Sequence, residues 1–157
     1  MAASSVAYSL DPGRIFLNVR GRKPAGRIAP GEEYERVRRE IAEAAMSMAD
    51  PATGEPIVDR VYNREELYHG LYVDAAPDLV LAMRDGYVPK GSFGKPNLTF
   101  KGASLVGMHT TPDALLYMQG TRQISRRPYI ADVAPTILDL LKVPIPADMD
   151  GRSLLRV

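Results

Sequence analysis

The feature that most constrains the fold is an amphipathic helical pattern over residues 31–49. Its apolar side chains recur at spacings of three and four, which places them on one stripe of a helix. Pro30 suits the first helical position and Asp50-Pro51 ends the pattern. The stripe needs a surface to cover, most simply one face of a β-sheet. Its members are Tyr34, Val37, Ile41, Ala44, Ala45 and Met48.

Short apolar runs elsewhere predict the strands of that sheet. They are residues 15–19, 57–62, 78–83 and 114–118, and the run at 78–83 is typical of a strand buried on both faces. Residues 63–68 predict a helical turn capped by Asn63, and residues 132–141 predict a second helix. This order predicts an α/β fold, a sheet with covering helices, with strand direction left open. A length of 157 residues predicts a single domain, residues 1–157.

Composition narrows the class of protein. A net charge of +1 gives no electrostatic argument for nucleic acid or an anionic membrane. No stretch approaches the ~18 apolar residues of a membrane span, and the N-terminus lacks the basic region of a signal peptide. The chain has no Cys, so disulfides and thiolate metal sites are excluded. We expect a cytoplasmic protein with neither nucleic acid nor membrane as a partner.

Two basic clusters and one long loop give only weak indications of function. Residues 20–27 form a basic loop, for which a solvated connection is favoured over a phosphate contact. Arg36, Arg38 and Arg39 are interpreted as a solvated helix face. Residues 87–102 form a Gly- and Pro-rich loop of a length that is commonly functional.

Residues 104–155 carry three motifs in sequence. A Gly-x-His loop with His109 precedes the predicted strand 114–118, a D-x-x-P-T-[IL]-L helix follows, and a D-G-x-x-L segment closes the chain. The matching residues are Gly107, His109, Asp132, Pro135, Thr136, Ile137, Leu138, Asp150, Gly151 and Leu154.

In this order and spacing the motifs resemble the C-terminal part of the alkaline phosphatase superfamily, in the type I phosphodiesterase and nucleotide pyrophosphatase branch. Residues 7–10, 13–19, 30–34, 65–70 and 76–79 also resemble that branch, so the likeness covers nearly the whole chain. It implies the C-terminal part of an alkaline phosphatase-like fold. Sulfatases have a similar closing motif and are the more distant alternative.

The resemblance implies a metal role for His109. In the family this His binds a divalent metal, zinc, at a two-metal site that activates a hydroxyl nucleophile. The family's Ser or Thr nucleophile and its Asp-His metal pair have no counterpart in this sequence. We therefore expect no catalytic residue in this chain, no tightly bound metal and no hydrolysis by the chain alone.

Other candidate residues have structural interpretations. His69 lies among aromatic residues and is expected to pack or to form a hydrogen bond. The Asp132 carboxylate is expected to accept hydrogen bonds from backbone N–H groups at a helix start. Asp148 and Asp150 are expected to form a tight turn, and Asp113 carries no assigned role.

Two functions remain open at this stage. The chain is expected to be the C-terminal portion of a metal-dependent phosphodiesterase-like hydrolase that works with a complementing N-terminal catalytic part. Alternatively, it is a non-catalytic module of the same origin that binds a partner or itself, as a homodimer. An incomplete sheet favours association, since it leaves an edge and a face exposed.

Overall fold

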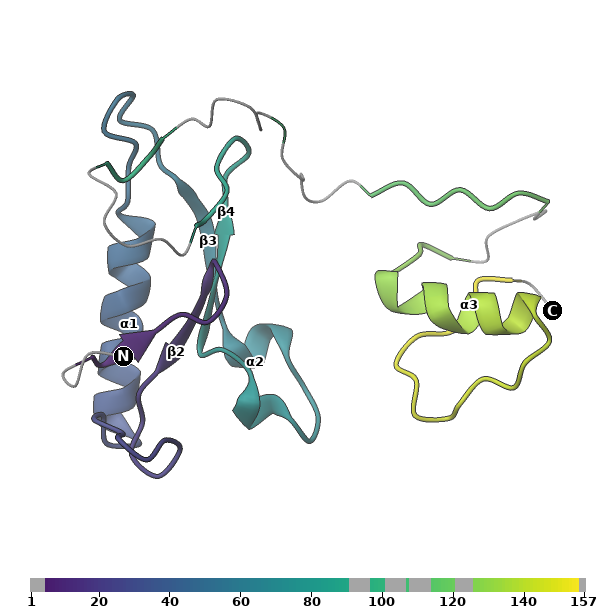
Figure 1. Ribbon diagram of the computed structural model, residues 1–157, viewed down its shortest axis with the longest axis horizontal. Coiled ribbons are helices and arrows are strands. Elements are labelled where there is room, and N and C mark those ends of the chain that lie inside the picture. Colours follow the sequence, from purple (N-terminus) through teal and green to yellow (C-terminus); the bar gives the residue numbers. More distant parts are fainter. Residues whose placement is uncertain (1–4, 91–96, 101–106, 108–113, 121–125, 156–157) are drawn as a thin grey trace. The chain divides into compact units, whose positions relative to one another are not determined.

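A computed structural model describes residues 5–90, 97–100, 107, 114–120 and 126–155 of the chain (Figure 1). Contacts divide the chain into two compact units, Met1–Thr110 and Thr111–Val157, hereafter unit 1 and unit 2. The single domain predicted over residues 1–157 stays a prediction. No helix in the described part of the chain is long and apolar enough to cross a membrane.

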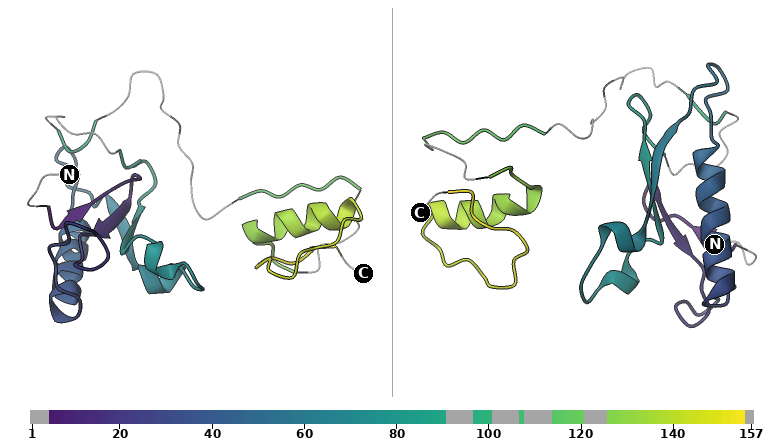
Figure 2. Two further views of the ribbon diagram at one scale, coloured as in Figure 1. Left: turned by 60° about the horizontal axis from the view of Figure 1, so that its bottom comes forward. Right: turned by 180° about the vertical axis from the view of Figure 1, so that it is seen from behind.

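Unit 1 contains an antiparallel four-stranded sheet with one long helix against it (Figures 1 and 2). Its strands are β1 (Ala7–Tyr8), β2 (Arg14–Leu17), β3 (Val58–Asn63) and β4 (Leu79–Met83), in the order β1-β2-β4-β3. Every neighbouring pair is antiparallel. The α/β fold with a covering helix is confirmed, and the strand direction that the sequence left open is antiparallel throughout.

The helix α1 (Glu32–Met46) packs against β3 and β4. Val37 and Ala45 from the predicted stripe are buried, whereas Ala44 is exposed. Glu32 rather than Pro30 takes the first helical position, and the cap residue Gly31 has a φ of 91°, in the region that glycine tolerates. The Glu33 carboxylate accepts a 2.7 Å hydrogen bond from the Ala29 N–H, which fixes the chain entering the helix.

The core of unit 1 lies between α1 and the sheet. Leu17 and Leu79 have no exposed surface, and Val37 is 8% exposed. The prediction that residues 78–83 are buried on both faces is wrong beyond Leu79, because Val80 to Met83 are only half-buried. A sheet with a helix against one face does not need an apolar strand on both sides.

Short elements follow β3. Helix α2 (Arg64–Leu67) has Asn63 as its cap residue, as predicted, and the Asn63 N–H donates to the Glu66 carboxylate at 2.7 Å. The 3₁₀ turn η1 (Val73–Ala75) leads into β4. In the loop beyond β4, the Tyr87 hydroxyl and Thr99 Oγ1 both donate to the Asp50 carboxylate, at 2.9 and 3.2 Å.

Unit 2 is built around helix α3 (Val133–Leu140), which the 3₁₀ turn η2 (Ile130–Asp132) introduces. The helix ends in a double backbone bond: the Lys142 N–H donates to the Asp139 carbonyl, and the Val143 N–H donates to the Leu138 carbonyl. This is a Schellman arrangement, and it holds Lys142 at a φ of 58°.

The predicted strand at residues 114–118 is wrong in the described structure. The segment has no secondary structure, and Leu115 and Tyr117 are 95% and 79% exposed. An extended segment becomes a strand only where a neighbour supplies ladder hydrogen bonds. The described sheet of unit 1 consists of β1 to β4 and does not include this segment.

Candidate functional site

The two histidines do not assemble a metal centre in the described part of the chain. His109 lies outside the described residues, whereas the neighbouring Gly107 is described and exposed. His69 is exposed between α2 and η1, so the packing alternative is wrong, and a hydrogen bond from this residue stays a prediction. The described residues include no group of three or more His, Cys, Asp or Glu placed to hold a metal. A catalytic zinc generally takes about three protein ligands, and the described residues do not bring that number together at one place.

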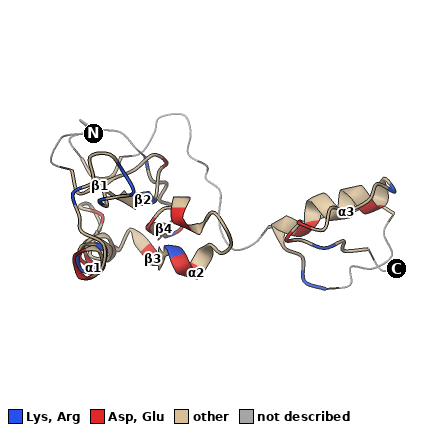
Figure 3. Cartoon of the chain, turned by 90° about the horizontal axis from the view of Figure 1, so that it is seen from below, with Lys and Arg blue, Asp and Glu red and all other residues tan. Residues whose placement is uncertain are grey.

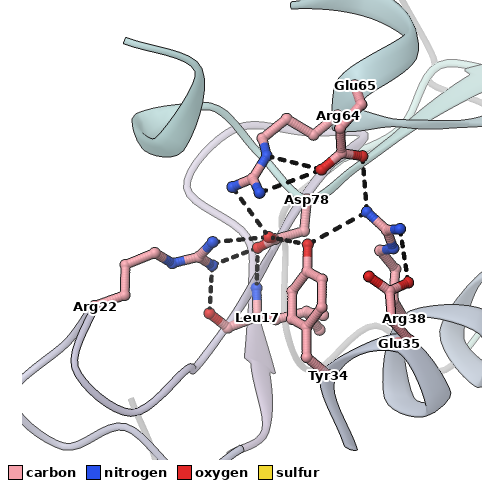
Figure 4. A network of polar contacts seen from close by, with 8 residues as sticks. All are labelled: Leu17, Arg22, Tyr34, Glu35, Arg38, Arg64, Glu65 and Asp78. Atoms are coloured by element: carbon pink, nitrogen blue, oxygen red, sulfur yellow. Dashed lines mark hydrogen bonds and ion pairs between the residues drawn. The ribbon is translucent and has the colours of Figure 1, made fainter. Parts of the chain in front are cut away.

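The most elaborate polar site surrounds Asp78, a carboxylate with no exposed surface (Figure 4). Its Oδ2 accepts from the Leu17 N–H at 2.6 Å and from Arg22 at 2.5 Å. Its Oδ1 accepts from Arg22 at 2.8 Å and from the Tyr34 hydroxyl at 2.8 Å. Arg64 approaches Oδ1 at 3.6 Å. One buried charge thus joins β2, the basic loop, α1 and α2.

Burial alone would raise the pKa of Asp78, since it disfavours the charged form. The hydrogen bonds from Arg22, the Leu17 N–H and Tyr34 outweigh burial and hold the pKa below its usual value. Burial and the bond to Asp78 raise the pKa of Tyr34 to about 12. The site therefore holds an ionised carboxylate against a neutral phenol at ordinary pH.

A second ring of charges surrounds this centre. Arg38 donates to Glu65 at 2.8 Å and to Glu35 at 2.7 Å, and its guanidinium lies 5.1 Å from the Tyr34 ring centre. Arg64 pairs with Glu65 at 3.2 Å. Basic and acidic segments accordingly alternate around α2 in Figure 3. The Arg38 side chain is only 15% exposed, so its interpretation as solvated was wrong.

An open pocket of about 400 Å³ lies beside this network. It is lined by the basic loop, the residues that lead into α1, and the segment around α2 and η1. Asp78 is not among the lining residues, because it sits behind the arginines. The lining residues are Val19, Gly21, Arg22, Pro30, Gly31, Tyr34, Arg64 and Asp74.

Unit 2 has its own buried carboxylate, Asp132, which is 2% exposed. It accepts from Arg126 at 2.5 Å, from the Arg152 N–H at 3.0 Å and from the Tyr129 N–H at 2.8 Å. The hydrogen bonds from Arg126 and the two backbone groups hold the pKa of Asp132 well below its usual value. Asp132 accepts from backbone N–H groups, but not from those of α3 as predicted: Tyr129 is the cap residue of η2, and Arg152 lies in the closing segment.

Besides the bond from the Arg152 N–H to Asp132, a second contact joins the D-x-x-P-T-[IL]-L helix motif to the D-G-x-x-L motif. Thr136 Oγ1 donates to the Asp132 carbonyl at 2.5 Å and accepts from the Leu154 N–H at 3.0 Å. A Cβ at Gly151 would collide with the Ala131 carbonyl, so only glycine fits there. The helix motif and the D-G-x-x-L motif are therefore parts of one hydrogen-bonded unit.

Sequence reasoning missed the Asp78 site. Asp78 was assigned only as the start of a strand, and Arg22 was included in a solvated loop. A charged residue next to a fully apolar run was the available signal, since such a residue is costly to bury unless it is paired. Its partners are 44 and 56 residues away, and no local pattern links them.

Comparisons with known proteins yield one short partial match. No family model matches the chain, and no solved structure matches it. A stretch of 27 residues is 56% identical to the 2,3-bisphosphoglycerate-independent phosphoglycerate mutase of Microcystis aeruginosa (strain NIES-843 / IAM M-2473). The match spans 17% of this chain and 5% of that protein.

Proposed function

We propose that this chain is the C-terminal portion of a metal-dependent hydrolase similar to type I phosphodiesterases and nucleotide pyrophosphatases. In the whole enzyme His109 supplies one ligand to a divalent metal, zinc, and the loop at residues 87–102 borders the substrate entrance. The remaining metal ligands and the nucleophile come from a complementing N-terminal catalytic part. The proposed setting is the cytoplasm.

The joining of the two C-terminal motifs is the observation that carries this proposal. Asp132 accepts from the Arg152 N–H and Thr136 accepts from the Leu154 N–H. Hydrogen bonds therefore join the helix motif to the closing motif, the two motifs that carry the resemblance. The similarity to a phosphoglycerate mutase lends further support, because that name denotes an enzyme acting on a phosphate ester.

The described residues account for a supporting role rather than for catalysis. The carboxylates of Asp78 and Asp132 accept hydrogen bonds from several groups each. Neither is poised to take a proton near neutral pH, since both have lowered pKa values. We accordingly expect the isolated chain not to hydrolyse phosphodiesters.

The test compares this chain alone with this chain co-expressed with a complementing catalytic part, using a nitrophenyl phosphodiester and added zinc. We expect turnover only in the combined sample, and loss of that turnover on His109→Ala. His69→Ala is the matched control, because His69 is the other histidine of the chain and is exposed. Zinc-dependent turnover by the isolated chain, or a combined sample indifferent to His109→Ala, would refute the proposal.

A second function, a self-associating module, is favoured by the surface of α3. Ile137 and Leu140 of this short helix and Leu141, its C-cap residue, are 49%, 52% and 66% exposed. Burying such surface against a second copy is worth roughly 25 cal/mol per Å². Light scattering on the purified chain should give a dimer that Leu140→Gln with Leu141→Gln converts to a monomer. A wild-type monomer at high micromolar concentration would rule this function out.

A further inference from the structure

The pocket of unit 1 has a charge pattern that the hydrolase proposal does not use. Two of its lining side chains are cationic, Arg22 and Arg64, and one is anionic, Asp74. Arg22 pairs with Asp78, and Arg64 pairs with Glu65 and lies 3.6 Å from Asp78; neither acid is a lining residue. The charged side chains that line the pocket itself are therefore two arginines and one aspartate.

Acidic partners hold both arginines in place, Asp78 in the case of Arg22 and Glu65 in the case of Arg64. Arg22 gives three hydrogen bonds, two to Asp78 and one to the Leu17 carbonyl. A guanidinium has further N–H donors beyond these. The side chains of Arg22 and Arg64 keep 23% and 13% of their surface exposed, whereas Asp78 keeps none. Arginine side chains fixed in this way suit oxyanions, since the planar guanidinium matches the geometry of a phosphate. A side chain that is already ordered also loses little conformational entropy when it binds a ligand.

The backbone of the pocket leaves room for a ligand. Gly21 and Gly31 both line it, and a Cβ placed on either would meet no atom within 4 Å. A volume of about 400 Å³ is larger than an inorganic phosphate needs and falls in the range of small-molecule sites. Val19, Pro30 and the Tyr34 ring supply an apolar lining for an organic group.

We propose that this pocket binds a small organic phosphate monoester, with its phosphate on Arg22 and Arg64 and its organic group against Tyr34 and Pro30. Asp74 is exposed in η1, where it repels additional negative charge and can accept a hydroxyl of the ligand. The site needs neither His109 nor a metal. It therefore goes beyond the proposed hydrolase function and stands or falls separately from it.

The test is a titration of the full chain with inorganic phosphate, glycerol phosphate and glycerol, followed by NMR of the backbone amides. We expect the Gly21 and Gly31 signals to shift with both phosphates, at lower concentration with glycerol phosphate, and not to shift with glycerol. Gly54 is the reference, because it does not line the pocket. Unmoved Gly21 and Gly31 signals would overturn the proposal, and equal affinity for the two phosphates would overturn its organic part.

Charge variants with matched controls sharpen the test. Arg64→Gln should weaken glycerol phosphate binding roughly tenfold, the value of one charge-assisted hydrogen bond. Arg60→Gln should not, because Arg60 lies on β3 outside the pocket. Asp74→Asn should strengthen binding roughly two- to fivefold by removing a like charge.

Asp59→Asn changes the net charge equally but lies on β3 outside the pocket, so it should leave the affinity unchanged. Arg22 is left intact, because its loss would leave Asp78 without its main partner. The comparison of Asp74→Asn with Asp59→Asn does not disturb the hydrogen bonds around Asp78. It therefore keeps the test valid if the Arg64→Gln protein unfolds. Equal effects of Asp74→Asn and Asp59→Asn would mean general charge attraction and would overturn the site.

Discussion

The Tyr34 hydroxyl donates a 2.8 Å hydrogen bond to Asp78 Oδ1, across 44 residues of sequence. Tyr34 lies on α1 and Asp78 immediately precedes β4. The same carboxylate accepts from the Leu17 N–H at the end of β2. One buried charge therefore fastens the helix to the sheet, and the integrity of unit 1 depends on it.

Asp78→Asn should destabilise unit 1 by roughly 3 kcal/mol, the lower end for breaking a buried ion pair, because Arg22 keeps some contact with water. An amide has the shape of the carboxylate but leaves Arg22 without its ionised partner. Urea unfolding followed by far-ultraviolet circular dichroism measures the change. Asp59→Asn, at an exposed position on β3, is the control. An Asp78→Asn protein as stable as this control would contradict the role assigned to Asp78.

Acid should weaken unit 1 through the same group. The folded pKa of Asp78 is lowered, so the ionised carboxylate contributes stability above its unfolded pKa of about 3.9. That contribution is lost as the pH falls through the folded pKa. The stability difference between wild type and Asp78→Asn should therefore shrink below about pH 4. Urea midpoints of both proteins over an acid pH series measure it, and a constant difference would be evidence against the argument.

Alkali should act on Tyr34 with the opposite sign. Its folded pKa is raised to about 12, so the neutral phenol contributes fully below its unfolded pKa of about 10. That contribution is lost as the pH rises through the folded value. Tyr34→Phe should flatten the fall in stability over this range, whereas Tyr72→Phe, at a position 83% exposed, should not. Absorbance titration of the phenols provides an independent measure, and a Tyr34 that ionises with the exposed tyrosines would contradict the prediction.

Elements with a strong local pattern could be predicted from the sequence. Helix α1 and the Asn63 cap form as expected, although Ala44 of the predicted stripe is exposed, since both elements depend on residues within a few positions of one another. Residues 114–118 were misjudged because an apolar run states only that a segment suits a strand. Whether it becomes one depends on a neighbour that the run does not encode.

The buried polar sites could be predicted only in part. Asp132 lies at the start of α3, as its motif predicts, and accepts from backbone N–H groups, but these belong to Tyr129 and Arg152 and not to α3. Its bond to Arg152 joins segments 20 residues apart, and the bonds of Asp78 span more. Such contacts follow from how the elements pack, and a single sequence carries no signal for the pairing.

Lys142→Gly should stabilise unit 2 by up to about 1 kcal/mol, because Lys142 holds a φ of 58° that glycine adopts without steric cost. Lys142→Ala is the matched control: it removes the side chain and keeps the strain. Hydrogen exchange at the Val143 amide, which donates to the Leu138 carbonyl, reports the change. Equal exchange rates in the Gly and Ala variants would show that the backbone conformation contributes nothing.

Thr136→Val tests the bond between the two C-terminal motifs. The buried Leu154 N–H donates to Thr136 Oγ1 at 3.0 Å, and valine removes that acceptor while nearly keeping the shape. An unsatisfied buried N–H costs roughly 1–3 kcal/mol, so exchange at the Leu154 amide should accelerate about tenfold or more. Thr136→Ser keeps the hydroxyl and loses only a methyl group, so it should protect Leu154 better than valine does. If serine is the more damaging of the two substitutions, then methyl packing rather than the hydrogen bond joins the motifs.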